Sequence, residues 1–235
     1  MPELVDAVVF YTVFLFSVTL HEAGHAWAAK RGGDLTAYLG GQVSIDPLPH
    51  IRREPFGMVI LPIIALVMWG WPFGYASAPY DTDWARQHPR RAAWMALAGP
   101  GANLALVVVA ALVIRFGLAI DVFAAPPSVN FSQITTAHSA GLADAAALLI
   151  SVFFSMNLLL FVLNMIPVPP LDGSGALPLL MSREVAGRYQ EALWAQPMLG
   201  WIGILMAWGL LRLVWDDVFL LAVNLAHPVS HYVAN

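Results

Sequence analysis

The sequence predicts an all-α integral membrane protein: a polytopic helical bundle of about four to six membrane segments, with a small β or re-entrant element between the first and second full spans. Hydrophobic residues make up 59% of the 235 residues and charged residues 11%, against about 25% charged in an average soluble protein. The mean hydropathy is +0.70, and the apolar residues gather in blocks long enough to cross a bilayer. Spans with short loops use up a chain of this length, so we predict a single domain over residues 1–235.

The apolar blocks define the expected elements in chain order. Residues 4–29 form a first full span, and residues 56–71 form a shorter block interrupted by Pro62. Residues 92–116 and 142–166 form two further full spans, and residues 197–214 form a fourth, followed by a short apolar tail at 218–226. The stretch "AYLGGQVSIDPLPH" at 37–50 mixes glycine, proline and β-forming residues, which predicts strand or hairpin structure at the membrane surface.

The basic residues predict the orientation. Nine of the eleven lysines and arginines lie in segments 30–91 and 183–188, while residues 117–141 contain none. Basic loops stay on the cytoplasmic side, so we expect a multi-pass membrane protein with its N-terminus outside. Because block 56–71 has basic residues on both flanks, we expect it to enter and leave by the same face.

Charge and cysteine content exclude several classes of function. The net charge of −4 is small and the basic residues are scattered, which gives no footprint for nucleic acid. The chain has no cysteine, which excludes disulfides and any thiolate nucleophile or ligand.

The end of the first span carries a metal-binding pattern, "LHEAGHAWAAKRGGD" at 20–34. Positions four apart share one face of a helix, so the imidazoles of His21 and His25 converge as two ligands of one zinc ion require. Glu22 lies beside that face and is placed to act as general base on a zinc-bound water. The alternative is that these three side chains only form hydrogen bonds inside a helical bundle, but polar groups in a span favour a functional site.

Asp172, in "FVLNMIPVPPLDGSG" at 161–175, is the candidate third ligand. It follows the third full span on the same predicted side as the two histidines, and the prolines before it break the helix. Irregular backbone at membrane depth is tolerated where it is buried in protein or lines a wet cavity. Taken alone, Asp172 would be read more readily as a helix N-cap, and the histidine motif reverses that preference.

Together these segments resemble the site-2 protease family of intramembrane zinc metalloproteases, in its short prokaryotic form without a PDZ domain. The strongest likeness is "HEAGH" in a membrane span followed by "NMIPVPPLDG". "DPLPHI", "FGYASAP" and "LAGPGANLAL" resemble intervening blocks of the family, so the similarity runs from Val5 to Gly175. The chain departs from the family with "LDGSG" in place of "LDGG" and "HIRREPFG" in place of "HIDPIG".

The resemblance implies a role for each site residue. His21, His25 and Asp172 would bind one zinc ion, Glu22 would be the catalytic base, and Asn164 would help to hold the substrate or the oxyanion. It also implies a prokaryotic cell membrane and, as the reaction, hydrolysis of peptide bonds in or near transmembrane segments of membrane-protein substrates. Counting back along the helix from the basic Lys30 places the active site near the cytoplasmic face of the bilayer. A helical substrate must unwind first, and "FGYASAP" or "GGQVSI" could hold it by strand addition.

Two other functions remain open at this point. Metal transporters of the ZIP type also place His-Glu-x-x-His on a membrane helix, but they use about eight spans and a second polar motif that this chain lacks. A pseudoprotease could bind helices without cutting them, although the intact Glu22 disfavours it.

Other polar residues in the apolar blocks receive structural roles. For Asn157 and Asn103 we favour hydrogen bonding and packing between helices over a site role. The remaining histidines lie in predicted loops or in the tail, where a solvated or interfacial side chain is expected: His50, His88, His138, His227 and His231.

Overall fold

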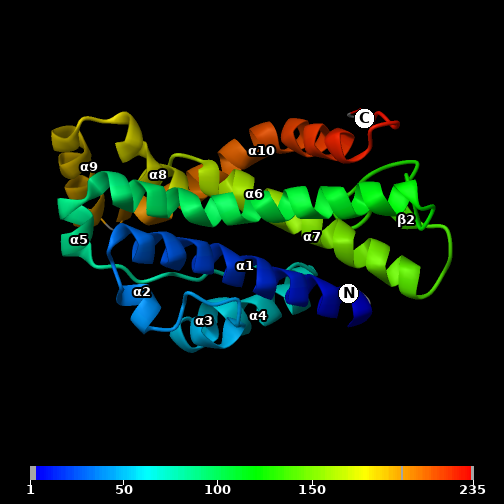
Figure 1. The fold of residues 1–235 in the computed structure, drawn as a ribbon, viewed down its shortest axis with the longest axis horizontal. Helices are drawn as coiled ribbons and strands as arrows, with labels where there is room; N and C mark the ends of the chain where they lie inside the picture. Colours follow the sequence, from blue (N-terminus) through cyan, green and yellow to red (C-terminus); the bar gives the residue numbers. More distant parts are fainter. Residues whose placement is uncertain (1–3, 197, 234–235) are drawn as a thin grey trace.

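The computed structural model describes residues 4–196 and 198–233, and within them the chain is a bundle of long helices (Figure 1). In this part of the chain, four helices are long and apolar enough to cross a membrane: α1 (Leu4–Gly32), α6 (Pro89–Ala119), α7 (Leu142–Met165) and α10 (Met198–Ala226). The predicted all-α polytopic fold is therefore confirmed, and the ends of α1, α6 and α7 lie within three residues of the ends of their apolar blocks.

The core lies where α1, α6, α7 and α10 face one another. One cluster of buried side chains joins α6, α7 and α10 and includes Ile114, Phe154 and Val223. A second joins α1 to α7 through Val13 and Met156. The outward faces of the same helices are also apolar and exposed, as expected of helices that face lipid.

The predicted fourth span and the apolar tail are one helix. Residue 197, the expected start of the span, lies outside the described residues, and α10 runs without a break from Met198 to Ala226. The expected gap was wrong because Asp216 and Asp217 lower the local hydropathy without interrupting the helix. Their side chains are exposed, and the backbone hydrogen bonds of a helix do not depend on them.

The chain between α1 and α6 is helical where strands were predicted. It forms α2 (Thr36–Leu39), α3 (Pro47–Arg53), a π-helical turn (Phe56–Ile60), α4 (Leu61–Trp69) and α5 (Thr82–Gln87). In the described residues the strands are instead β1 (Phe123–Ala124) and β2 (Thr136–Ala137), an antiparallel pair between α6 and α7. The prediction for 37–50 missed a helix start: Asp46 accepts a hydrogen bond from Leu48 N as N-cap of α3, and Pro47 follows it.

Residues 56–81 run toward the N-terminal end of α1 and then back toward its C-terminal end. Trp71, just after α4, packs its ring against Phe10 near the N-terminal end of α1, with ring centroids 5.3 Å apart. The following chain is extended without strand pairing, and Tyr75 N donates to Gly57 O at 3.1 Å. It ends at Asp81, whose N–H donates to Asp34 beyond the other end of α1. This path agrees with the predicted re-entrant course, and its placement in a bilayer stays a prediction.

Beyond α7 the chain forms three short elements. These are α8 (Asp172–Ala176), a 3₁₀ turn (Leu177–Leu180) and α9 (Arg183–Ala195), which begins at the N-cap Ser182. Tyr189 of α9 donates its hydroxyl to Ser174 O at 3.0 Å, so α9 is tied to the turn that carries Asp172.

Candidate metal centre

Two histidines of α1 present their ring nitrogens to each other inside the bundle. His21 and His25 lie one turn apart, both rings are buried, and their Nε2 atoms are 3.0 Å apart. This is the convergence that four-residue spacing on a helix predicts.

Asp172 completes the cluster from a distant part of the chain. Its Oδ2 lies 3.0 Å from His21 Nε2 and 3.3 Å from His25 Nε2. Asp172 does not cap α8, because the N-cap residue is Leu171 and no side-chain cap hydrogen bond forms there. The structure therefore brings the three predicted ligands together.

The hydrogen bonds behind the two rings determine which nitrogens carry protons. His21 Nδ1 lies 2.6 Å from Asn103 Oδ1, and His25 Nδ1 lies 2.7 Å from Met95 O. Both partners are acceptors, so each Nδ1 donates and the neutral ring leaves a lone pair on Nε2.

The cluster therefore fits a metal cation. Two Nε2 lone pairs and the buried Asp172 Oδ2, which accepts no hydrogen bond from the described residues, would repel one another without a positive charge between them. A proton bridges only two such atoms, whereas a metal ion binds all three. The ligands of a tetrahedral zinc ion at 2.0–2.1 Å lie about 3.3 Å apart, close to the separations here.

Glu22 lies beside this cluster and is buried. Ligand atoms of Glu22, His21 and His25 all lie within 4.8 Å of one another. Since His21, His25 and Asp172 already supply three ligands, the Glu22 carboxylate would remain available beside the site as a proton acceptor, the role that its position in the motif predicts.

A glycine of α6 allows the two rings to pack against that helix. A Cβ atom added to Gly99 would lie 2.2 Å from His25 Nε2 and 2.7 Å from His21 Nε2. Any larger residue would displace the rings, so "AGPGAN" contributes an open backbone surface to the site.

Asn103 contacts a candidate ligand, a site role that the sequence analysis did not favour. It is fully buried, accepts from His21, and donates from Nδ2 to Asn157 Oδ1 at 2.9 Å. Asn157 in turn donates to Ser17 Oγ at 3.0 Å, which confirms its predicted interhelical role. The sequence offered one signal for this role, an amide side chain inside an apolar block, which Asn103 shares with Asn157. It could not show that His21 is the partner of Asn103.

Other polar residues are placed differently. Asn164 lies on α7 and donates to Leu160 O of its own helix at 3.0 Å. This hydrogen bond does not connect Asn164 to the ligand cluster, so its role stays a prediction. The expectation of solvated histidines was wrong for His50 and His227, which are both 1% exposed. His50 forms a hydrogen bond with the backbone carbonyl of Ser44, and His227 with that of Ile134. These hydrogen bonds offset the cost of removing a polar ring from water.

Comparisons with known proteins agree with this geometry. The "Putative zinc metalloprotease YwhC" of Bacillus subtilis is 26% identical over 198 residues, covering 82% of this chain and 75% of the relative. The "Putative zinc metalloprotease Rip2" of Mycolicibacterium smegmatis is 31% identical, and that of Mycobacterium tuberculosis 32% identical, each over 164 residues. Each of these two alignments covers 70% of this chain and 54% of the relative, so the chain spans about half the length of the Rip2 proteins.

No solved structure matches the chain. The family model of Peptidase family M50 matches residues 9–205, a stretch that includes His21, Glu22, His25 and Asp172. On this match, and with the resemblance of its motifs confirmed, the chain belongs to Peptidase family M50, the site-2 protease family of metalloproteases.

Proposed function

We propose that this protein is an intramembrane zinc metalloendopeptidase that hydrolyses peptide bonds in or near transmembrane segments of membrane-protein substrates. The observation that carries the proposal is the convergence of His21, His25 and Asp172 beside the buried Glu22, in a bundle of helices able to span a membrane. Membership of a peptidase family gives no support to the transporter alternative.

His21, His25 and Asp172 would hold the zinc ion. When bound, zinc supplies Lewis-acid chemistry: it lowers the pKa of a water that it binds and polarises a carbonyl group. The Asn103 amide and the Met95 carbonyl keep the proton of each ring on Nδ1, so both Nε2 atoms remain available as ligands.

Glu22 would take the proton of the attacking water and later pass it to the leaving amine. Its burial shields the carboxylate from bulk water, which strengthens its interaction with the reacting groups. Asn164 would donate to the developing oxyanion once its amide leaves Leu160 O, an interaction typically worth about 3 kcal/mol in catalysis.

The placement of this site in the membrane follows from the charge distribution. The basic segments predict that the N-terminus is outside and that the metal site lies near the cytoplasmic face. Substrate would therefore be cut close to its cytoplasmic end, and the surrounding lipid bilayer would be the other partner of the protein.

The test is purification in detergent, metal analysis, and cleavage of a panel of single-span substrates. Glu22→Gln should keep one zinc per chain and lose cleavage, whereas Asp172→Ala should lose both zinc and cleavage while remaining folded. Asn164→Ala should keep zinc and lose only rate.

Glu184→Gln is the matched control, because Glu184 is an exposed carboxylate of α9. It should behave as the parent. Full cleavage by Glu22→Gln would refute the base assignment, and parent-like zinc affinity in Asp172→Ala would leave the third ligand unidentified.

A further inference from the structure

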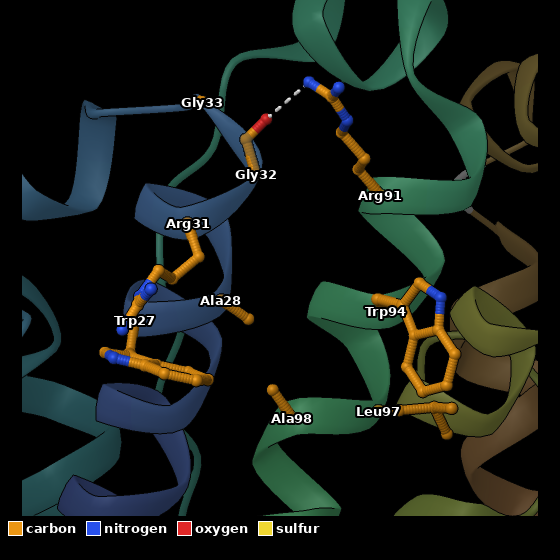
Figure 2. Close-up of a pocket in the computed structure, with 9 residues that line it drawn as sticks. All are labelled: Trp27, Ala28, Arg31, Gly32, Gly33, Arg91, Trp94, Leu97 and Ala98. Carbon is orange, nitrogen blue, oxygen red and sulfur yellow. Dashed lines mark hydrogen bonds between the residues drawn. The ribbon is translucent and has the colours of Figure 1, made fainter.

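A groove of about 610 Å³ opens between α1 and α6 outside the metal centre (Figure 2). Ala28 of α1 and Ala98 of α6 face each other across it, and their small side chains leave it open. Trp27 and Trp94 extend from the two helices on its opposite sides. The groove lies at the end of α1 where the apolar run gives way to basic residues.

The mouth of the groove is positively charged. Arg31 and Arg91 belong to its lining, and none of the described residues that line it is acidic. Arg91 donates to Gly32 O at 3.1 Å through one nitrogen, which holds the guanidinium at the mouth and leaves other N–H groups free to donate. The Arg31 guanidinium lies 5.3 Å from the centre of the Trp27 ring.

The walls below the arginines are aromatic and exposed. Trp27 is 53% exposed and Trp94 is 63% exposed. Tryptophan at this position on a spanning helix is typical of the boundary between headgroups and hydrocarbon, where one edge of the ring is wet and the other is in lipid. The groove thus has a cationic end and an apolar end, in the order in which a phospholipid is built.

We propose that this groove binds one anionic phospholipid. Its phosphate would lie between Arg31 and Arg91, which suit phosphate oxygens through paired N–H donors, and its glycerol and upper acyl chains would lie between the two tryptophans. A purely apolar helix from another protein fits less well, because it would leave the two guanidinium groups without an anionic partner at the membrane surface. The proposal does not depend on proteolysis.

The groove also adjoins the metal centre through the backbone. Ala98 precedes Gly99, whose missing side chain leaves room for both histidine rings, and the carbonyl of Ala98 lies against Gly24 of α1. A lipid on Ala98 would therefore contact the turn of α6 that supports His21 and His25, and its binding should raise the thermal stability of the bundle.

The experiment is native mass spectrometry of the full chain in a neutral detergent, with phosphatidylglycerol and phosphatidylcholine of identical acyl chains. The parent should retain phosphatidylglycerol selectively. The double variant Arg31→Gln with Arg91→Gln should bind it about 20- to 30-fold more weakly, since each arginine near an anionic surface contributes roughly a fivefold factor. Glutamine keeps a donor for Gly32 O and preserves folding.

The control is the double variant Arg52→Gln with Arg90→Gln, which removes the same charge from two exposed arginines that do not line the groove. It should bind phosphatidylglycerol within twofold of the parent. A second control adds glycerol phosphate alone, which should not raise the melting temperature.

Four results would overturn the proposal. The first is equal retention of the two lipids by the parent, and the second is unchanged selectivity in Arg31→Gln with Arg91→Gln. The third is protection by glycerol phosphate as strong as by the lipid, which would make this a site for a soluble phosphate. Displacement of phosphatidylglycerol from the parent by a neutral single-span peptide would likewise assign the groove to a helix.

Discussion

Asn103 links the metal centre to the rest of the bundle at the scale of single residues. Its carbonyl oxygen accepts a hydrogen bond from His21 Nδ1, and its amide nitrogen donates to Asn157 Oδ1 and to the carbonyl of Ser17. Since the amide nitrogen is bound to acceptors, the oxygen must face the ring. A side chain that only positions a ligand thereby determines which nitrogen of His21 can bind metal.

Replacement of Asn103 tests this positioning role. We expect Asn103→Ala to weaken zinc binding by about 10- to 100-fold, the usual effect of losing a partner of a metal-bound histidine. Asn103→Asp keeps an acceptor for His21 but loses the donor to Asn157 and Ser17, so it should retain more affinity than Asn103→Ala and less than the parent, as measured by competition with a chelator. Equal loss in both variants would instead indicate that Asn103 acts only in helix packing.

Gly99 offers a test that leaves every ligand in place. In Gly99→Ala the new Cβ would lie 2.2 Å from His25 Nε2, so the rings must move and zinc binding should fall at least tenfold. Gly101→Ala is the matched control in the same helix, because a Cβ there meets no described atom within 4 Å. It should bind zinc normally and stabilise α6 by up to about 1 kcal/mol, measured by thermal unfolding.

At the scale of elements, the end of α10 is held by polar contacts to the β1–β2 connection. His227, directly after the helix, donates from Nε2 to Ile134 O at 2.8 Å. Asn224 makes two hydrogen bonds with the backbone of Tyr232, which folds the following residues back onto α10. Burial lowers the pKa of His227 below its ordinary value of 6.5, and the hydrogen bond to Ile134 offsets part of that effect.

This lowered pKa gives the segment 227–233 a dependence on pH. The unfolded segment takes up a proton near pH 6.5 while the buried ring resists it, so the docking is fully stable above that pH and weakens as the pH falls. Hydrogen exchange of residues 227–233 should therefore be faster at pH 5.5 than at pH 7.5, after correction for the intrinsic rate.

Two variants isolate the residue responsible. His227→Gln can still donate to Ile134 O but does not titrate, so the pH dependence should vanish. His231→Gln alters an exposed histidine and should leave it intact. A dependence that persists in His227→Gln would assign it to another group.

At the scale of the whole molecule, the basic segments and the metal centre are expected on one side of the membrane. Arg90 at the start of α6 and Ser139 in the connection before α7 are both exposed, and α6 separates them. Figure 1 shows the two ends of α6 at opposite ends of the bundle. The charge rule predicts that the Arg90 end is cytoplasmic.

Cysteine labelling tests this orientation on a clean background, because the chain has no cysteine. With an impermeant thiol reagent added to intact cells, Ser139→Cys should be labelled, and Arg90→Cys should be labelled only after the membrane is opened. The reverse pattern would place the metal centre at the outer face.

Much of the fold could be predicted because a membrane span is a local property. Hydropathy over about 20 residues reflects the cost of burying backbone and side chains in lipid, and it located α1, α6 and α7 closely. Hydropathy also found α10 but ended it too early, at residue 214, because the helical backbone continues through Asp216 and Asp217. The β-forming composition of 37–50 misled for another reason, since the N-cap Asp46 starts a helix there. The re-entrant course of residues 56–81 could be predicted only from the basic residues on both flanks of block 56–71.

The sequence by itself determined the metal-binding motif. His21, Glu22 and His25 lie within two turns of one helix, where the 3.6-residue repeat sets their relative directions whatever surrounds them. Asp172 could be named because its chemistry and its predicted side of the membrane matched what two histidines lack.

Only the tertiary structure decided how that motif is completed. Asn103 lies 82 residues from His21, Gly99 accommodates the rings from another helix, and Arg31 and Arg91 share a groove as lining residues. Each of these arrangements depends on how α1 and α6 are rotated about their axes and how closely they approach. Rotation and approach result from the packing of many side chains at once, so no single stretch of sequence contains them.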